Sequence, residues 1–151
     1  MEDLIEKVTA YVRTYMSNYD PSHDYNHIRR VSRLAQQLLA AETSDSGSDS
    51  QTPAPALDPV VVRLAALLHD VGDKKYLREG EDATTMVRDV LLGFGAGKEL
   101  AEKVQTICLG VSYSSEMRDP GRVRELIELY PERECSHLYA PVPAHTHMLP
   151  S

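Results

Sequence analysis

The chain has 151 residues and a formal net charge of −7, with 42% hydrophobic and 26% charged residues. This is the length of one globular domain, and the composition excludes collagen-like, coiled-coil and small disulfide-stabilised classes. The acidic balance argues against nucleic-acid binding. The longest apolar run, residues 64–68, is too short to cross a bilayer, and residues 1–10 have no secretory signal. With two cysteines, we expect a cytoplasmic protein, a nuclear location also being open.

Two helices are predicted within residues 1–41. Apolar residues at spacings of three and four define the first, and a break follows at residues 17–22, where Pro21 disfavours helix. The second is expected to start near Ser22 or Asp24. Its predicted buried face carries the apolar residues Ile28, Val31, Leu34, Ala35, Leu38 and Leu39.

A polar segment then separates these helices from the rest of the domain. Residues 43–57 consist mainly of Ser, Thr, Pro, Gly and Asp with one large hydrophobe, which is too little apolar surface to offset the entropy of ordering. We interpret them as a flexible surface insertion. Asp58-Pro59 has the form of a helix start, with Asp as N-cap and Pro at the first helical position.

The helix that begins there is almost continuously apolar over residues 60–68, which predicts burial on most sides, and Gly72 is a suitable terminator. Further helices are expected at about 82–92, at 98–111 and after Pro120. The sequence predicts an all-α bundle of about six helices without a sheet. We expect the domain to occupy residues 1–130 and an irregular tail, which contains four prolines, to occupy residues 131–151.

The strongest chemical feature is the end of the apolar helix, where His69 is followed directly by Asp70. Buried ionisable groups are costly unless they are paired or bound to metal. An imidazole and a carboxylate together suit Mn, Fe, Co, Zn or Mg, and histidine favours the transition metals. The alternative is structural, with His69 capping its own helix and Asp70 capping the next segment.

A second feature is the pair His23 and His27, whose spacing of four residues can place both side chains on one helical face. The spacing is that of two-histidine zinc helices, but Asp24 stands where those helices have Glu after the first His. The alternative is a polar helix start with solvated histidines.

The two segments, in this order and with their flanks, resemble the HD superfamily of metal-dependent phosphohydrolases. The small bacterial and fungal branch has the pattern SHDxxHxxRV followed by AALLHDxGDxKY. Residues 22–31 read SHDYNHIRRV, and residues 65–76 read AALLHDVGDKKY. The resemblance implies an HD-type helical domain with a divalent metal cofactor (Mn, Co, Fe, Zn or Mg). It also implies a small phosphorylated substrate, a nucleotide being favoured, whose phosphoester or pyrophosphate bond is hydrolysed.

The resemblance also implies roles for individual residues. The metal ligands are His27, His69 and Asp70, and Asp70 also orients the attacking water. Asp73 accepts or shuttles a proton, its alternative being a helix cap. Arg30 and Lys75 contact phosphate, because guanidinium and ammonium groups stabilise phosphoryl charge. Lys75 is also counted among the catalytic residues. The alternative for both residues is that they are solvated surface charges. His23 lines the substrate pocket or stabilises a leaving group.

One part of the family pattern is missing. The family's later metal-binding aspartate has no counterpart, because no aspartate follows Asp119. The chain therefore resembles a C-terminally truncated member, either an active phosphohydrolase or a catalytically incomplete domain that binds a phosphate ligand or a partner. A plain helical interaction domain is the third reading. Without covering helices, the apolar face at Val123, Leu126 and Ile127 would favour a homo-oligomer.

Overall fold

The computed structural model describes residues 1–18, 24–45, 57–73 and 77–110, and these residues form an all-helical domain without strands. The elements are α1 (Glu2–Tyr15), the short 3₁₀ helix η1 (Met16–Asn18), α2 (Tyr25–Asp45), α3 (Pro59–Leu68), α4 (Met86–Gly93) and α5 (Lys98–Gly110). This confirms the predicted all-α class. The sixth predicted helix and the tail at 131–151 lie outside the described residues.

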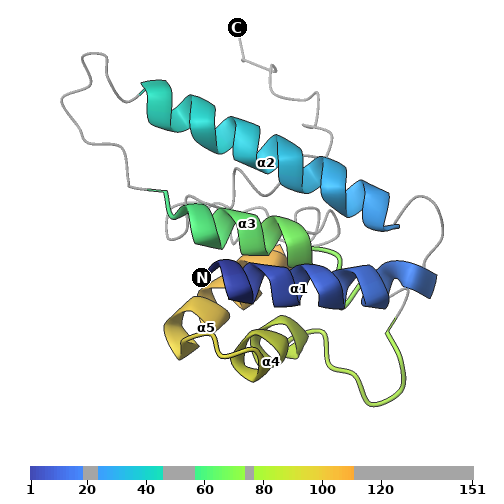
Figure 1. The fold of residues 1–151 in the computed structure, drawn as a ribbon. Helices are drawn as coiled ribbons and strands as arrows, with labels where there is room; N and C mark the ends of the chain where they lie inside the picture. Colours follow the sequence, from blue (N-terminus) through green and yellow to red (C-terminus); the bar gives the residue numbers. More distant parts are fainter. Residues whose placement is uncertain (19–23, 46–56, 74–76, 111–151) are drawn as a thin grey trace, which may run out of the picture.

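Helix α3 lies at the centre of the described bundle (Figure 1), with α2 on one side and α1 and α5 on the other. Its near-continuous apolar sequence has a direct structural reason, since two apolar clusters meet it on different faces. Val62 and Ala66 pack against Val31 and Ala35 of α2. The larger cluster joins the remaining buried faces of the helices and contains Val61, Leu64, Ala65, Leu67 and Leu68 from α3.

The start of α3 agrees with the sequence prediction. Asp58 is the N-cap in an extended conformation, and its Oδ1 accepts hydrogen bonds from the amides of Val60 (2.9 Å) and Val61 (3.4 Å), while Pro59 takes the first helical position. The insertion predicted at residues 43–57 is shorter at both ends in the structure. Helix α2 continues to Asp45, and Leu57 packs against the α2–α3 cluster. Residues 46–56 lie outside the described part of the chain.

Replacing Asp58 with alanine is expected to lower the free energy of unfolding by about 0.5–2 kcal/mol, because two amides of the first turn of α3 lose their acceptor. Asp58→Asn retains an acceptor oxygen and serves as the matched control. Urea unfolding of both variants measures the difference. Equal losses for the two variants would contradict a hydrogen-bonding cap and assign the effect to the charge.

The predicted buried face of α2 is wrong at two positions. Leu34 and Leu38 are 48% and 39% exposed, whereas Ile28, Val31 and Ala35 are buried as predicted. The reason is that α3 covers only a narrow stripe of α2. Of the described helices, none is both long enough and apolar enough to cross a membrane.

Candidate metal centre

The first half of the site is built by the turn that ends α3. His69 is the C-cap residue, the amide of Val71 donates to the carbonyl of Leu68 (3.0 Å), and the amide of Asp73 donates to the carbonyl of Asp70 (3.3 Å). Gly72 has φ +87°, a conformation that L side chains rarely adopt, and a Cβ there would lie 3.3 Å from the Cα of Ala83. The predicted terminator therefore allows the tight turn that holds His69 and Asp70 against the core.

The second half comes from the start of α2. The Oδ1 of Asp24 accepts a hydrogen bond from the amide of His27 (3.1 Å), and the carbonyl of Asp24 accepts from the amides of His27 and Ile28. This fixes the first turn of α2, as predicted for a cap near Ser22 or Asp24. Ile28 is fully buried, so the turn that carries His27 is anchored in the core next to the end of α3.

These two turns bring His27, His69 and Asp70 together. The Oδ2 of Asp70 lies 3.5 Å from Nε2 of His27 and 3.4 Å from Nε2 of His69, and one ligand atom from each residue lies within 4.8 Å of the others. The two imidazole rings have a centroid separation of 5.5 Å at 60°. The side chains of His69 and Asp70 are 0% and 7% exposed, and that of His27 is 16% exposed.

A hydrogen bond at Nδ1 fixes the orientation of the His69 ring. Nδ1 lies 2.7 Å from the carbonyl oxygen of Ala66. Because a carbonyl can only accept, Nδ1 donates to it, and the other ring nitrogen, Nε2, faces Asp70 and His27. Metal-binding histidines commonly donate their other N–H to a carbonyl in this way. The same hydrogen bond caps the end of α3, which is the alternative role predicted for His69. Capping through Nδ1 and metal binding through Nε2 are compatible.

The donor set fits a divalent transition metal. Bonds of about 2.0–2.2 Å to nitrogen and oxygen bring ligand atoms to within about 4.4 Å of one another, so the observed separations need only small movements. Two imidazoles and one carboxylate suit Mn, Fe, Co or Zn better than an all-oxygen site would. Metal binding would also compensate for burying a carboxylate and two histidines in the interior.

Cys108 lies on α5 close to this cluster but does not extend it. Its Sγ is 3.8 Å from the carbonyl oxygen of Ala65. Burial raises the pKa of the thiol far above its usual range, and the nearby Asp70 carboxylate raises it further. The thiol is therefore protonated at neutral pH, which makes it a small apolar core residue rather than a nucleophile or a ligand.

The other residues singled out from the sequence are placed as follows. Asp73 is partly buried in the turn after Asp70. Arg30 is exposed on α2 and lines an open groove with Arg29 and Arg33. Arg29 and Arg33 were not predicted as site residues. The signal that could have identified them is the presence of three arginines within five residues of an otherwise acidic chain. His23 and Lys75 lie outside the described residues.

Comparison with known proteins identifies the family. The model of the HD domain family matches residues 24–139, more than half of the chain. The chain is also 29% identical over 118 residues to the uncharacterized protein YpgQ of Bacillus subtilis (strain 168), an alignment that covers 78% of this chain and 49% of that relative. The chain thus spans about half the length of the relative it matches. No solved structure matches it significantly. With the His69-Asp70 pair and His27 gathered at one point of a helical bundle, the chain belongs to the HD domain family.

Proposed function

We propose that this chain is a metal-dependent phosphohydrolase that cleaves a phosphoester or pyrophosphate bond, with a nucleotide as the favoured substrate class. The observation that carries the proposal is the convergence of His27, His69 and Asp70 within 4.8 Å in a chain of the HD domain family. In the reaction, the oxygen of water bonds to phosphorus, the bond from phosphorus to the leaving oxygen breaks, and the proton of the water passes to the leaving group or to solvent.

His27, His69 and Asp70 are the residues that would hold the divalent ion, with Mn, Co, Fe, Zn and Mg as the candidates. When bound, such an ion supplies Lewis acidity at a phosphoryl oxygen and lowers the pKa of water. The chain's own contribution begins with His69, whose orientation is set by the carbonyl of Ala66. Asp70, fixed by the turn at Gly72, orients the attacking water and accepts its hydrogen bond.

Four further residues have proposed roles around this centre. Asp73 lies three residues beyond Asp70 in the same turn and is proposed to accept or shuttle a proton. Arg30, one turn after His27 on α2, is proposed to contact the phosphate, and so is Lys75. Lys75 would also act with Asp70 and Asp73 in catalysis, and His23 would line the substrate pocket.

A second candidate function is binding without turnover. It is favoured by one observation: the described residues contribute three donors, and only one of the three is a carboxylate. A single carboxylate brings little negative charge to the site, which weakens its affinity for a metal ion. In this reading the domain would bind a phosphate ligand or a partner protein.

Activity against a panel of nucleotides and simple phosphoesters, with Mn²⁺, Co²⁺, Zn²⁺ or Mg²⁺ added, decides between the two. We expect metal-dependent phosphate or pyrophosphate release that Asp70→Ala reduces at least about a thousandfold, because the ligand and the water-orienting group are lost together. Asp89→Ala, an exposed carboxylate on α4, is the matched control and should retain activity. Absence of turnover with every metal would favour binding alone, and turnover unaffected by Asp70→Ala would contradict the proposed site.

A further inference from the structure

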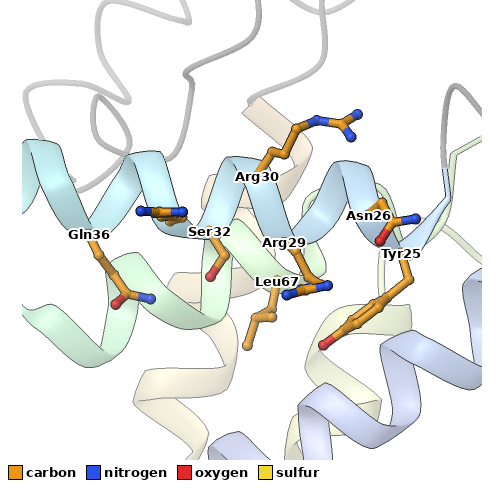
Figure 2. Close-up of a pocket in the computed structure, with 8 residues that line it drawn as sticks. Tyr25, Asn26, Arg29, Arg30, Ser32, Gln36 and Leu67 are labelled. Carbon is orange, nitrogen blue, oxygen red and sulfur yellow. The ribbon is translucent and has the colours of Figure 1, made fainter.

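An open groove of about 560 Å³ runs along α2 (Figure 2), and its described lining does not include His27, His69 or Asp70. Its described lining consists of the α2 residues Tyr25, Asn26, Arg29, Arg30, Ser32, Arg33 and Gln36, with Leu67 from α3. Tyr25, Arg29, Ser32 and Gln36 project to the side of α2 where Leu67 lies, whereas Arg30 projects away from it (Figure 2). The groove therefore follows one edge of the α2–α3 contact.

Helix geometry places that edge opposite His27. At 100° per residue, Arg29, Ser32 and Gln36 lie about 200°, 140° and 180° around α2 from His27. The buried stripe between the two edges is formed by Ile28, Val31 and Ala35. A similar relation holds on α3, where Leu67 precedes His69 by two residues and thus points about 200° away from it. The groove and the metal cluster lie on opposite sides of the same helix pair.

The groove concentrates positive charge in an acidic chain. Residues 24–40 contain Arg29, Arg30 and Arg33 but only one acid, Asp24, in a protein of net charge −7. Four other cationic side chains, those of Lys7, Arg63, Arg88 and Lys98, each lie 2.7–3.8 Å from a carboxylate. None of the three groove arginines has such a partner within the described part of the chain. Arg29 and Arg33 are also one turn apart, a like-charge pair that mildly destabilises α2.

Ser32 provides an independent indication of a ligand. The residue is 8% exposed, and its hydroxyl lines the groove. Helical hydroxyls in this protein bond to the carbonyl four residues earlier, as Thr9 does to Ile5 (2.7 Å) and Thr106 to Glu102 (2.9 Å). Within the described residues, the Ser32 hydroxyl forms no such bond. The hydroxyl of this largely buried residue lines the same groove as Arg29 and Arg33 and is thus available to an acceptor there.

The size and the remaining lining favour a small organic phosphate. Ligand sites commonly have volumes of about 300–1,000 Å³, so a groove of about 560 Å³ can hold a mononucleotide. Tyr25 and Leu67 offer apolar surface beside the polar groups. The guanidinium carbon of Arg13 from α1 lies 4.9 Å from the Tyr25 ring centroid, which holds this ring in place.

We infer that this groove is a second binding site, for a phosphate monoester, that requires no metal. Arg29 and Arg33 bind the phosphate oxygens, the Ser32 hydroxyl donates to one of them, and Tyr25 with Leu67 contacts the organic part of the ligand. The inference goes beyond the proposed phosphohydrolase activity and does not depend on it, because the His27–His69–Asp70 cluster faces the other edge of α2.

The test uses isothermal titration of the full chain in EDTA with inorganic phosphate and, separately, with AMP. Arg29→Ala/Arg33→Ala is expected to weaken binding of either probe about a hundredfold and Ser32→Ala about tenfold, since charge-assisted hydrogen bonds are lost. Arg63→Ala/Arg88→Ala removes the same charge elsewhere and should bind normally. Tighter binding of AMP than of phosphate would identify an organic phosphate as the ligand, and equal binding would identify free phosphate; either supports the site.

Three outcomes would overturn the inference: no binding of either probe, equal loss in both double variants, or loss of binding in Asp70→Ala with retention in Arg29→Ala/Arg33→Ala. If the arginine variant does not fold, amide chemical shifts of the unaltered protein give the answer. Phosphate should then shift the amides of Arg29, Ser32, Arg33 and Gln36, and shifts confined to residues 27 and 69–70 would again contradict a separate site. Metal-supplemented turnover tests the proposed phosphohydrolase activity, whereas phosphate binding in EDTA tests the second site. Failure of either proposal therefore leaves the other testable.

Discussion

His69→Ala is expected to lower the affinity for Mn²⁺ or Co²⁺ by more than about a hundredfold, since even loss of an outer-shell partner of a metal site costs about 10–100-fold. The Nε2 atom of His69 lies 3.4 Å from Asp70 Oδ2, and its side chain is fully buried. Isothermal titration and metal analysis after desalting measure the loss. A second readout is thermal: metal at about 100 times Kd stabilises the unaltered protein by about 2.7 kcal/mol, and the variant should show no such shift.

Two controls make the result specific to this site. His69→Gln preserves much of the side-chain volume, so it distinguishes loss of a ligand from formation of a cavity in the core. His145→Ala/His147→Ala removes two histidines near the C-terminal end of the sequence and should leave metal binding unchanged. Binding that survives in His69→Ala but disappears in the His145/His147 variant would place the metal elsewhere in the chain.

Leu68→Ala is expected to lower the free energy of unfolding by about 2–5 kcal/mol, a large part of the 5–15 kcal/mol typical of a domain. Leu68 is fully buried in the main core cluster and immediately precedes His69 in the chain, so its truncation leaves a cavity in the core at the end of the helix that carries His69. Urea unfolding of the variant measures the change, and metal titration shows whether the cavity also loosens the site.

Leu92→Ala is the matched control, because Leu92 is 41% exposed on α4. The same chemical change there should alter stability by less than about 1 kcal/mol. Similar losses in the two variants would contradict the burial that the structure assigns to the C-terminal end of α3.

Helix α4 shows why some boundaries could not be predicted from local sequence. A helix was expected from about residue 82, but α4 begins at Met86. The carboxylate of Asp82 accepts hydrogen bonds from the amide (2.9 Å) and hydroxyl (2.6 Å) of Thr84, which holds residues 82–85 in a turn and lowers the pKa of Asp82. The amide of Arg88 finds its acceptor in Gln105 Oε1 of α5 (3.0 Å). A cap supplied across the fold has no signature near the helix it caps.

By itself, the sequence determined the all-α class, the start of α3 at Asp58-Pro59 and the candidate His27, His69 and Asp70, because caps, periodicity and motif spacing are local properties. Only the tertiary structure decided that these three residues meet at one edge of the α2–α3 pair. It also decided that Arg29, Ser32 and Gln36 line the other edge, and that Leu34 and Leu38 are exposed. The physical reason is that a helical period specifies which residues share a face, whereas the neighbouring helix determines how much of that face is covered.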